Sequence, residues 1–60
     1  MNTLSISELE TVYDHLAAAL DKAPEDKREL FLVKLALLSA EALGDPQRTT
    51  ALAEIALIDL

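Results

Sequence analysis

The sequence predicts an all-α fold, a single domain of three helices over residues 1–60. No segment alternates apolar and polar residues in the manner of a half-buried β-strand. Apolar residues instead recur at spacings of three and four, which is the repeat of an amphipathic helix. The two prolines and the single glycine fall where helices would begin or end. The expected helices cover about residues 6–22, 24–43 and 46–59.

The first helix is expected to begin with a capping box. The hydroxyl of Ser5 can accept a hydrogen bond from the backbone N–H of Glu8, and the Glu8 carboxylate can reach back to Ser5. Leu4 before the cap can pack against Leu9 after it, as in a hydrophobic staple. The apolar stripe of this helix predicts one buried face and one wet face. The stripe consists of Ile6, Leu9, Val12, Tyr13, Leu16 and Leu20.

Short breaks separate the three helices. Ala23 and Pro24 break the first, because a residue before proline is pushed out of the α region, and Pro24 suits the first position of the next helix. Gly44 can close the second helix in the left-handed conformation. Asp45 can cap the third helix, with Pro46 at its first position. Because so short a connection favours antiparallel neighbours, we expect the last two helices to form a helical hairpin.

The second helix is apolar on nearly every side. At about 100° per residue, Lys27, Lys34 and Glu41 fall in one narrow polar row. Apolar side chains fill most of the remaining circumference, far more than the roughly 100° stripe of a surface helix, so we expect a buried helix. A small-residue patch in it consists of Ala36, Ser39 and Ala40. Such a patch either lets two helix backbones approach closely or fills the core of one chain.

Sixty residues are too few to cover such a helix. A chain of this length removes only about 60% of its unfolded-state surface from water on folding, and it has no cysteine for a disulfide. Two neighbouring helices would leave one side of the second helix open, so a further chain must cover that side. We therefore expect a homodimer, a helical bundle with a core shared between the chains. In it the second helix packs either on its symmetry mate or on the first and third helices of the partner. The predicted interface consists of Leu30, Phe31, Leu35, Leu37, Leu38, Leu57 and Leu60.

The residues do not indicate catalysis or metal binding. His15 is the only histidine, it falls on the wet face of the first helix, and no second ligand lies at a metal-binding spacing. Ser5 is better explained as a cap than as a nucleophile, because the pattern places no base beside it. Gly44 alone cannot build a glycine-rich phosphate loop. We expect no enzyme activity, no catalytic residue, no cofactor and no metal.

The charge of the chain limits its partners. Eleven acidic and five basic side chains give a formal net charge of -6, which repels nucleic acid and anionic lipid. A helix-turn-helix interpretation fails because no basic residue follows Arg48 within the third helix. The leucine-rich stretch at residues 30–43 is too short to span a bilayer, and the N-terminus lacks the pattern of a secretion signal. We expect a cytoplasmic protein that binds neither nucleic acid nor membranes.

A family resemblance lies in the stretch ELFLVKLALLSAEALGDPQRTTALAEIAL and the helix before it. A first helix with a tyrosine, here Tyr13, is followed by a leucine-rich helix that closes on Gly44 and Asp45, and then by an alanine-rich helix. This order resembles small bacterial all-helical proteins catalogued as a domain of unknown function. The resemblance covers most of the chain and implies no catalytic residue.

The sequence leaves three hypotheses about function. The first is a non-enzymatic helical module that self-associates as an assembly or adaptor piece. The second is an accessory subunit, or an antitoxin-like partner, that covers its apolar helix with a different, larger protein. The third is a regulator whose acidic ridge on the first helix, formed by Glu10, Asp14 and Asp21, imitates nucleic acid. The same ridge is otherwise a solvated face.

Overall fold

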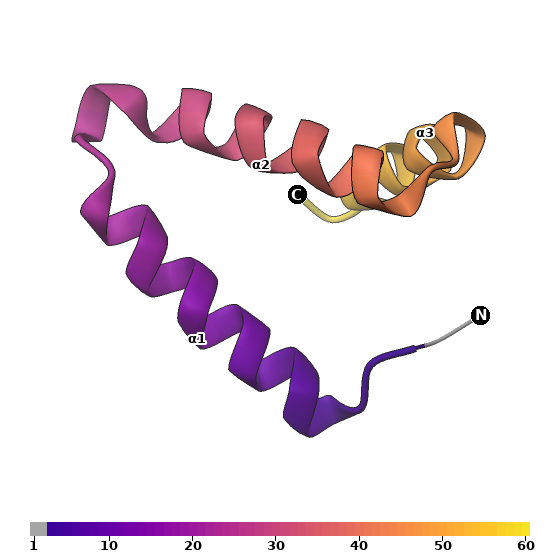
Figure 1. Cartoon of the computed structure of the whole chain (residues 1–60), viewed down its shortest axis with the longest axis horizontal. Coiled ribbons are helices and arrows are strands. Elements are labelled where there is room, and N and C mark those ends of the chain that lie inside the picture. Colours follow the sequence, from indigo (N-terminus) through magenta and orange to yellow (C-terminus); the bar gives the residue numbers. More distant parts are fainter. Residues whose placement is uncertain (1–2) are drawn as a thin grey trace.

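The computed structural model describes residues 3–60, and all of its regular elements are helices (Figure 1). α1 is Ile6–Lys22, η1 is a 3₁₀ turn at Glu25–Lys27, α2 is Arg28–Leu43 and α3 is Pro46–Ala56. No strand occurs between residues 3 and 60. The prediction of an all-α chain with three helices is confirmed. Residues 1 and 2 of the expected domain lie outside the described part.

The capping box at the start of α1 is confirmed. The backbone N–H of Ser5 donates to a carboxylate oxygen of Glu8 at 2.8 Å, and the N–H of Glu8 donates to the Ser5 hydroxyl at 3.1 Å. Two donors that the helix cannot satisfy internally are thus both satisfied. Leu4 and Leu9, expected to form a staple, each remain about half exposed.

The connection between α1 and α2 is extended. Ala23 has φ -75° and ψ 135°, and Pro24 has φ -55° and ψ 145°. α2 begins at Arg28 rather than at Pro24, because η1 comes first, and 3₁₀ turns of this kind are frequent at the N-termini of α-helices. Lys27, with φ -115° and ψ 3°, lies between the two helical stretches. Pro24 therefore precedes η1 and does not itself begin the α-helix.

The junction between α2 and α3 has the predicted local chemistry. Gly44 ends α2 in the left-handed conformation, with φ 70°, and its N–H donates to the carbonyl of Ala40 at 2.9 Å. The Asp45 side chain caps α3 by accepting from the backbone N–H of Arg48 at 3.1 Å. Pro46 is the first residue of α3, where its missing N–H costs nothing.

α3 ends earlier than its apolar pattern suggests, at Ala56 rather than near Asp59. The N–H of Leu57 donates to the carbonyl of Glu54 at 3.2 Å, only three residues back. Asp59 then adopts a positive φ of 56°. Hydrogen bonds between residues three positions apart tighten the last turn and satisfy terminal carbonyls, so the regular α-helix ends there.

The three helices do not form a closed bundle within one chain. α1 and α2 diverge from the bend at Pro24 as the arms of an open V, and α3 turns out of the line of α2 (Figure 1). No two described Cα atoms that are twelve or more residues apart lie within 8 Å of each other, so contacts between α2 and α3 are confined to their junction. The radius of gyration of the Cα atoms is 12.8 Å, whereas about 10.4 Å is typical of a folded chain of this length.

A single chain contains no buried core in its described part. Each residue from 3 to 60 is exposed or only half-buried. The accessible surface of the chain is 5626 Å², against about 3,800 Å² for a folded monomer of this mass. Among the described residues, α2 therefore contacts η1 at its N-terminus and the start of α3 at its C-terminus, and no helix packs along its length. The helix that the sequence most strongly predicts to be buried is left open to water.

Candidate association surface

The most exposed leucines of α2 lie on both flanks of its polar row. Leu37 is 67% exposed on one flank, and Leu38 is 59% exposed on the other. Leu30 lies one heptad before Leu37 and is exposed to a similar degree. Apolar side chains thus surround the lysine and glutamate row of α2, and a partner must cover more than one side of the helix to remove them from water.

A shallow groove along α2 gathers part of the predicted interface. It is lined by Phe31, Lys34, Leu35 and Leu38. Phe31 and Leu35 are half-buried, and they are the most sheltered residues of the predicted interface. Lys34 can lay its aliphatic stem along this groove while its ammonium group stays in water. The structure therefore brings three of the predicted interface residues to one place.

A second hollow lies at the junction of α2 and α3. α2 contributes the small-residue patch of Ala36, Ser39 and Ala40 together with Leu43, and α3 contributes Thr49, Leu52 and Ala53. The hydroxyl of Thr49 donates to the carbonyl of Asp45 at 3.0 Å, so its hydrogen-bonding capacity is used inside the helix. The patch therefore lets α3 begin close to α2 within the same chain, and the hollow stays open on one side.

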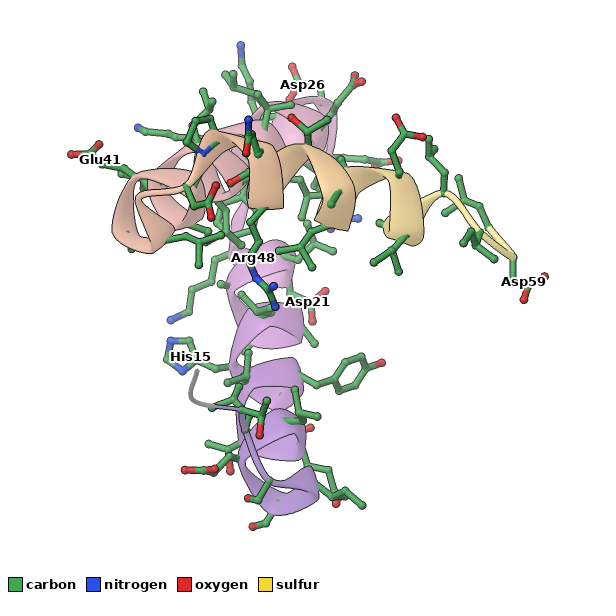
Figure 2. All side chains as sticks on the ribbon, turned by 90° about the vertical axis from the view of Figure 1, so that its right-hand side faces the viewer. His15, Asp21, Asp26, Glu41, Arg48 and Asp59 are labelled. Atoms are coloured by element: carbon green, nitrogen blue, oxygen red, sulfur yellow. The ribbon has the colours of Figure 1, made fainter. Side chains whose placement is uncertain are left out.

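Leu57 and Leu60, the last two residues of the predicted interface, follow the end of α3. Leu57 is largely exposed and Leu60 is fully exposed. Figure 2 places the neighbouring Asp59 at the far end of α3, away from Glu41 at the end of α2. The structure therefore does not bring Leu57 and Leu60 to the groove on α2. They form a separate apolar end of the molecule.

The apolar stripe of α1 was not part of the predicted interface. The sequence interpretation gave this stripe to a core, with contact to the partner's second helix as one of two arrangements. In one chain Ile6 is 78% exposed, Tyr13 is 71% exposed, and Leu9 and Val12 are exposed as well. The three- and four-residue spacing is the signal that could have found this surface. That spacing shows that one face of a helix is buried, and it does not tell whether the covering residues come from the same chain.

The ionisable side chains labelled in Figure 2 are spread along the described part of the chain. His15 and Asp21 project from α1, and Asp26, Glu41 and Arg48 come from three other elements (Figure 2). No group of three or more histidine, aspartate or glutamate side chains that could hold a metal ion occurs among residues 3–60. Within the same residues, no helix combines the length and the apolar composition needed to cross a membrane.

Glu8 is the one described residue with a clear electrostatic perturbation. The backbone N–H of Ser5 first, and the Ser5 side chain second, hold the pKa of the Glu8 carboxyl below its usual value of 4.5. Hydrogen bonds to a carboxylate favour its charged form. Because Glu8 belongs to a helix cap, this shift has a structural cause and marks no catalytic group.

Comparisons with known proteins found no matching family model, no similar curated protein and no similar solved structure. The exposed apolar surfaces of α1 and α2 are the features of this chain that bear on its function.

Proposed function

We propose that this protein is a non-enzymatic helical module that associates with itself and serves as an assembly or adaptor piece in the cytoplasm. The observation that carries the proposal is the absence of any buried residue between positions 3 and 60, in a chain of which 52% of the residues are hydrophobic. Such a chain gains its stability by covering apolar surface with a partner.

The energetics favour association over an open monomer. Each large apolar side chain left in water forgoes roughly 1.5–3 kcal/mol of burial free energy. Leu30, Leu37 and Leu38 are each 59–67% exposed, so together they forgo about 3–6 kcal/mol, a large share of the stability of a small domain. A closed two-fold dimer is the commonest way in which identical chains recover this free energy.

Sedimentation velocity on the purified full chain tests the proposal. We expect a discrete, soluble species of two copies at micromolar concentration. A poorly structured single copy or an aggregate that becomes soluble only when a different host protein is co-expressed would contradict self-association. That result would favour the accessory-subunit hypothesis, in which a larger protein covers the same leucines.

A further inference from the structure

α1 is an amphipathic helix with an exposed apolar face, and none of its Cα atoms lies within 8 Å of a described Cα atom twelve or more residues away. Leu9 and Val12 of its stripe are exposed, and α1 lies apart from α2 across an open V (Figure 1). α2 is the natural cover for that stripe, because it has unpartnered leucines on both flanks. The question is whether α1 reaches the α2 of its own chain or the α2 of a second copy.

The connector holds α1 of one chain apart from its own α2. Proline fixes φ near -65°, and a residue before proline is held in the extended region. Pro24 and Ala23 both adopt these conformations, with ψ of 145° and 135°. With the connector in this conformation, no Cα atom of α1 lies within 8 Å of a Cα atom of α2 that is twelve or more residues away. An element left uncovered in its own chain can be exchanged between identical chains at low cost.

The exposed area is large enough for the interface of an obligate dimer. The chain exposes about 1,800 Å² more than a folded monomer of its mass, 5626 Å² against about 3,800 Å². Burying that excess on each of two copies gives a total of about 3,600 Å², within the range of obligate homodimers, about 2,000–5,000 Å². A second copy of this chain is therefore large enough, and apolar enough, to complete the fold.

The charges favour pairing of α1 with α2 over pairing of two α1 helices. α1 carries four carboxylates, including Glu10 and Asp14, and one lysine, so two such helices side by side would repel. Residues 27–43, which comprise Lys27 and α2, carry three basic and two acidic side chains. α2 itself, Arg28–Leu43, carries two basic and two acidic side chains. α1 therefore meets less charge repulsion on α2 than on a second α1.

We propose that two copies exchange their first helices, so that the apolar stripe of α1 from each copy packs on α2 of the other. This inference rests on the proposed self-association and adds which surfaces meet. The two contacts are related by a two-fold axis, and the completed bundle contains helices from both chains. Association and the formation of the core are then one event.

Isotope-filtered NMR on the full wild-type chain tests the exchange directly. In a dimer assembled from equal amounts of ¹³C-labelled and unlabelled chains, we expect intermolecular NOEs between the methyl groups of Leu9 or Val12 and those of Leu30 or Leu37. A dimer in which all NOEs between α1 and α2 are intramolecular would overturn the exchange and leave the proposed function intact. A folded single copy would overturn both.

A matched pair of substitutions gives a second test. Leu9→Lys places a charge on the apolar stripe of α1, whereas Ala18→Lys adds the same charge to an exposed position on the opposite face. We expect Leu9→Lys to raise the Kd of the dimer about tenfold or more and Ala18→Lys to leave it within about twofold. Equal Kd values for the two variants, with a dimer that Leu37→Glu still disrupts, would show that α1 lies outside the interface.

Discussion

At the scale of single residues, the two hydrogen bonds between Ser5 and Glu8 lower the pKa of the Glu8 carboxyl. The carboxylate of Glu8 is favoured by the N–H and the hydroxyl of Ser5, so its folded-state pKa is lowered. The cap therefore contributes stability above the ordinary pKa of glutamate, and that contribution is lost as the pH falls through the lowered pKa. α1 should lose its cap only in acid.

We predict that Glu8 titrates below 4.5 in the wild-type chain and that Ser5→Ala raises this pKa part of the way back, because one of the two donors is removed. Side-chain NMR chemical shifts followed against pH measure both values. In Glu8→Gln, which cannot ionise, the acid-dependent loss of α1 helicity should be smaller than in the wild type. A wild-type Glu8 that titrates at or above its ordinary value would contradict the observed cap.

Leu37 is an exposed apolar residue in the predicted interface, and His15 is a polar residue on the wet face of α1. Leu37 lies in the apolar surface of α2, and a glutamate there would have to be buried unpaired in the dimer. We predict that Leu37→Glu, like Phe31→Glu, abolishes association or folding, whereas His15→Ala changes little.

Sedimentation velocity of these variants tests this prediction. Gln47→Glu is the control, because it adds the same charge at an exposed position of α3. Unchanged dimer mass in both Leu37→Glu and Phe31→Glu would show that α2 does not form the interface.

At the scale of elements, the end of α2 depends on a backbone conformation that favours glycine. Gly44 has φ 70°, and a Cβ built on it meets no atom within 4 Å. The cost of a side chain there is therefore the conformational strain alone. We predict that Gly44→Ala destabilises the protein by about 1–2 kcal/mol and that Gly44→Asn costs less, because asparagine tolerates this conformation better.

Urea unfolding at one fixed protein concentration compares the two Gly44 variants with the wild type. Equal destabilisation by alanine and asparagine would indicate a steric clash and contradict the conformational explanation.

The helix ends near Ser5, Gly44 and Asp45 could be predicted because they depend on residues three or four positions apart. The start of α2 and the end of α3 were less predictable. The 3₁₀ turn after Pro24 differs from an α-helix only in its hydrogen bonds, and so does the last turn at Leu57. The spacing of apolar residues does not record such small differences.

The groove of Phe31, Leu35 and Leu38 could also be predicted from the sequence, because these residues share a flank of one helix. The exposure of the α1 stripe could not be predicted, because burial within a chain and burial between chains require the same residues. The position of α1 relative to α2 depends on the dihedral angles of Ala23 and Pro24, which a hydrophobic pattern does not record.

At the scale of the whole molecule, folding and association are expected to be linked. Any partner that binds the folded state and not the unfolded state stabilises it in proportion to the logarithm of its concentration. We therefore predict that the thermal unfolding midpoint of this protein rises with its own concentration. Circular dichroism melts over a wide range of chain concentrations measure this shift. A midpoint independent of concentration would indicate that one chain is stable alone.

The mass of the chain in dilute solution, measured by multi-angle light scattering together with helicity, tests the central claim most directly. We predict a particle of twice 6.5 kDa at micromolar concentration, which loses helical structure as dilution drives it to single copies. A rigid, fully helical single copy at every concentration would contradict the account.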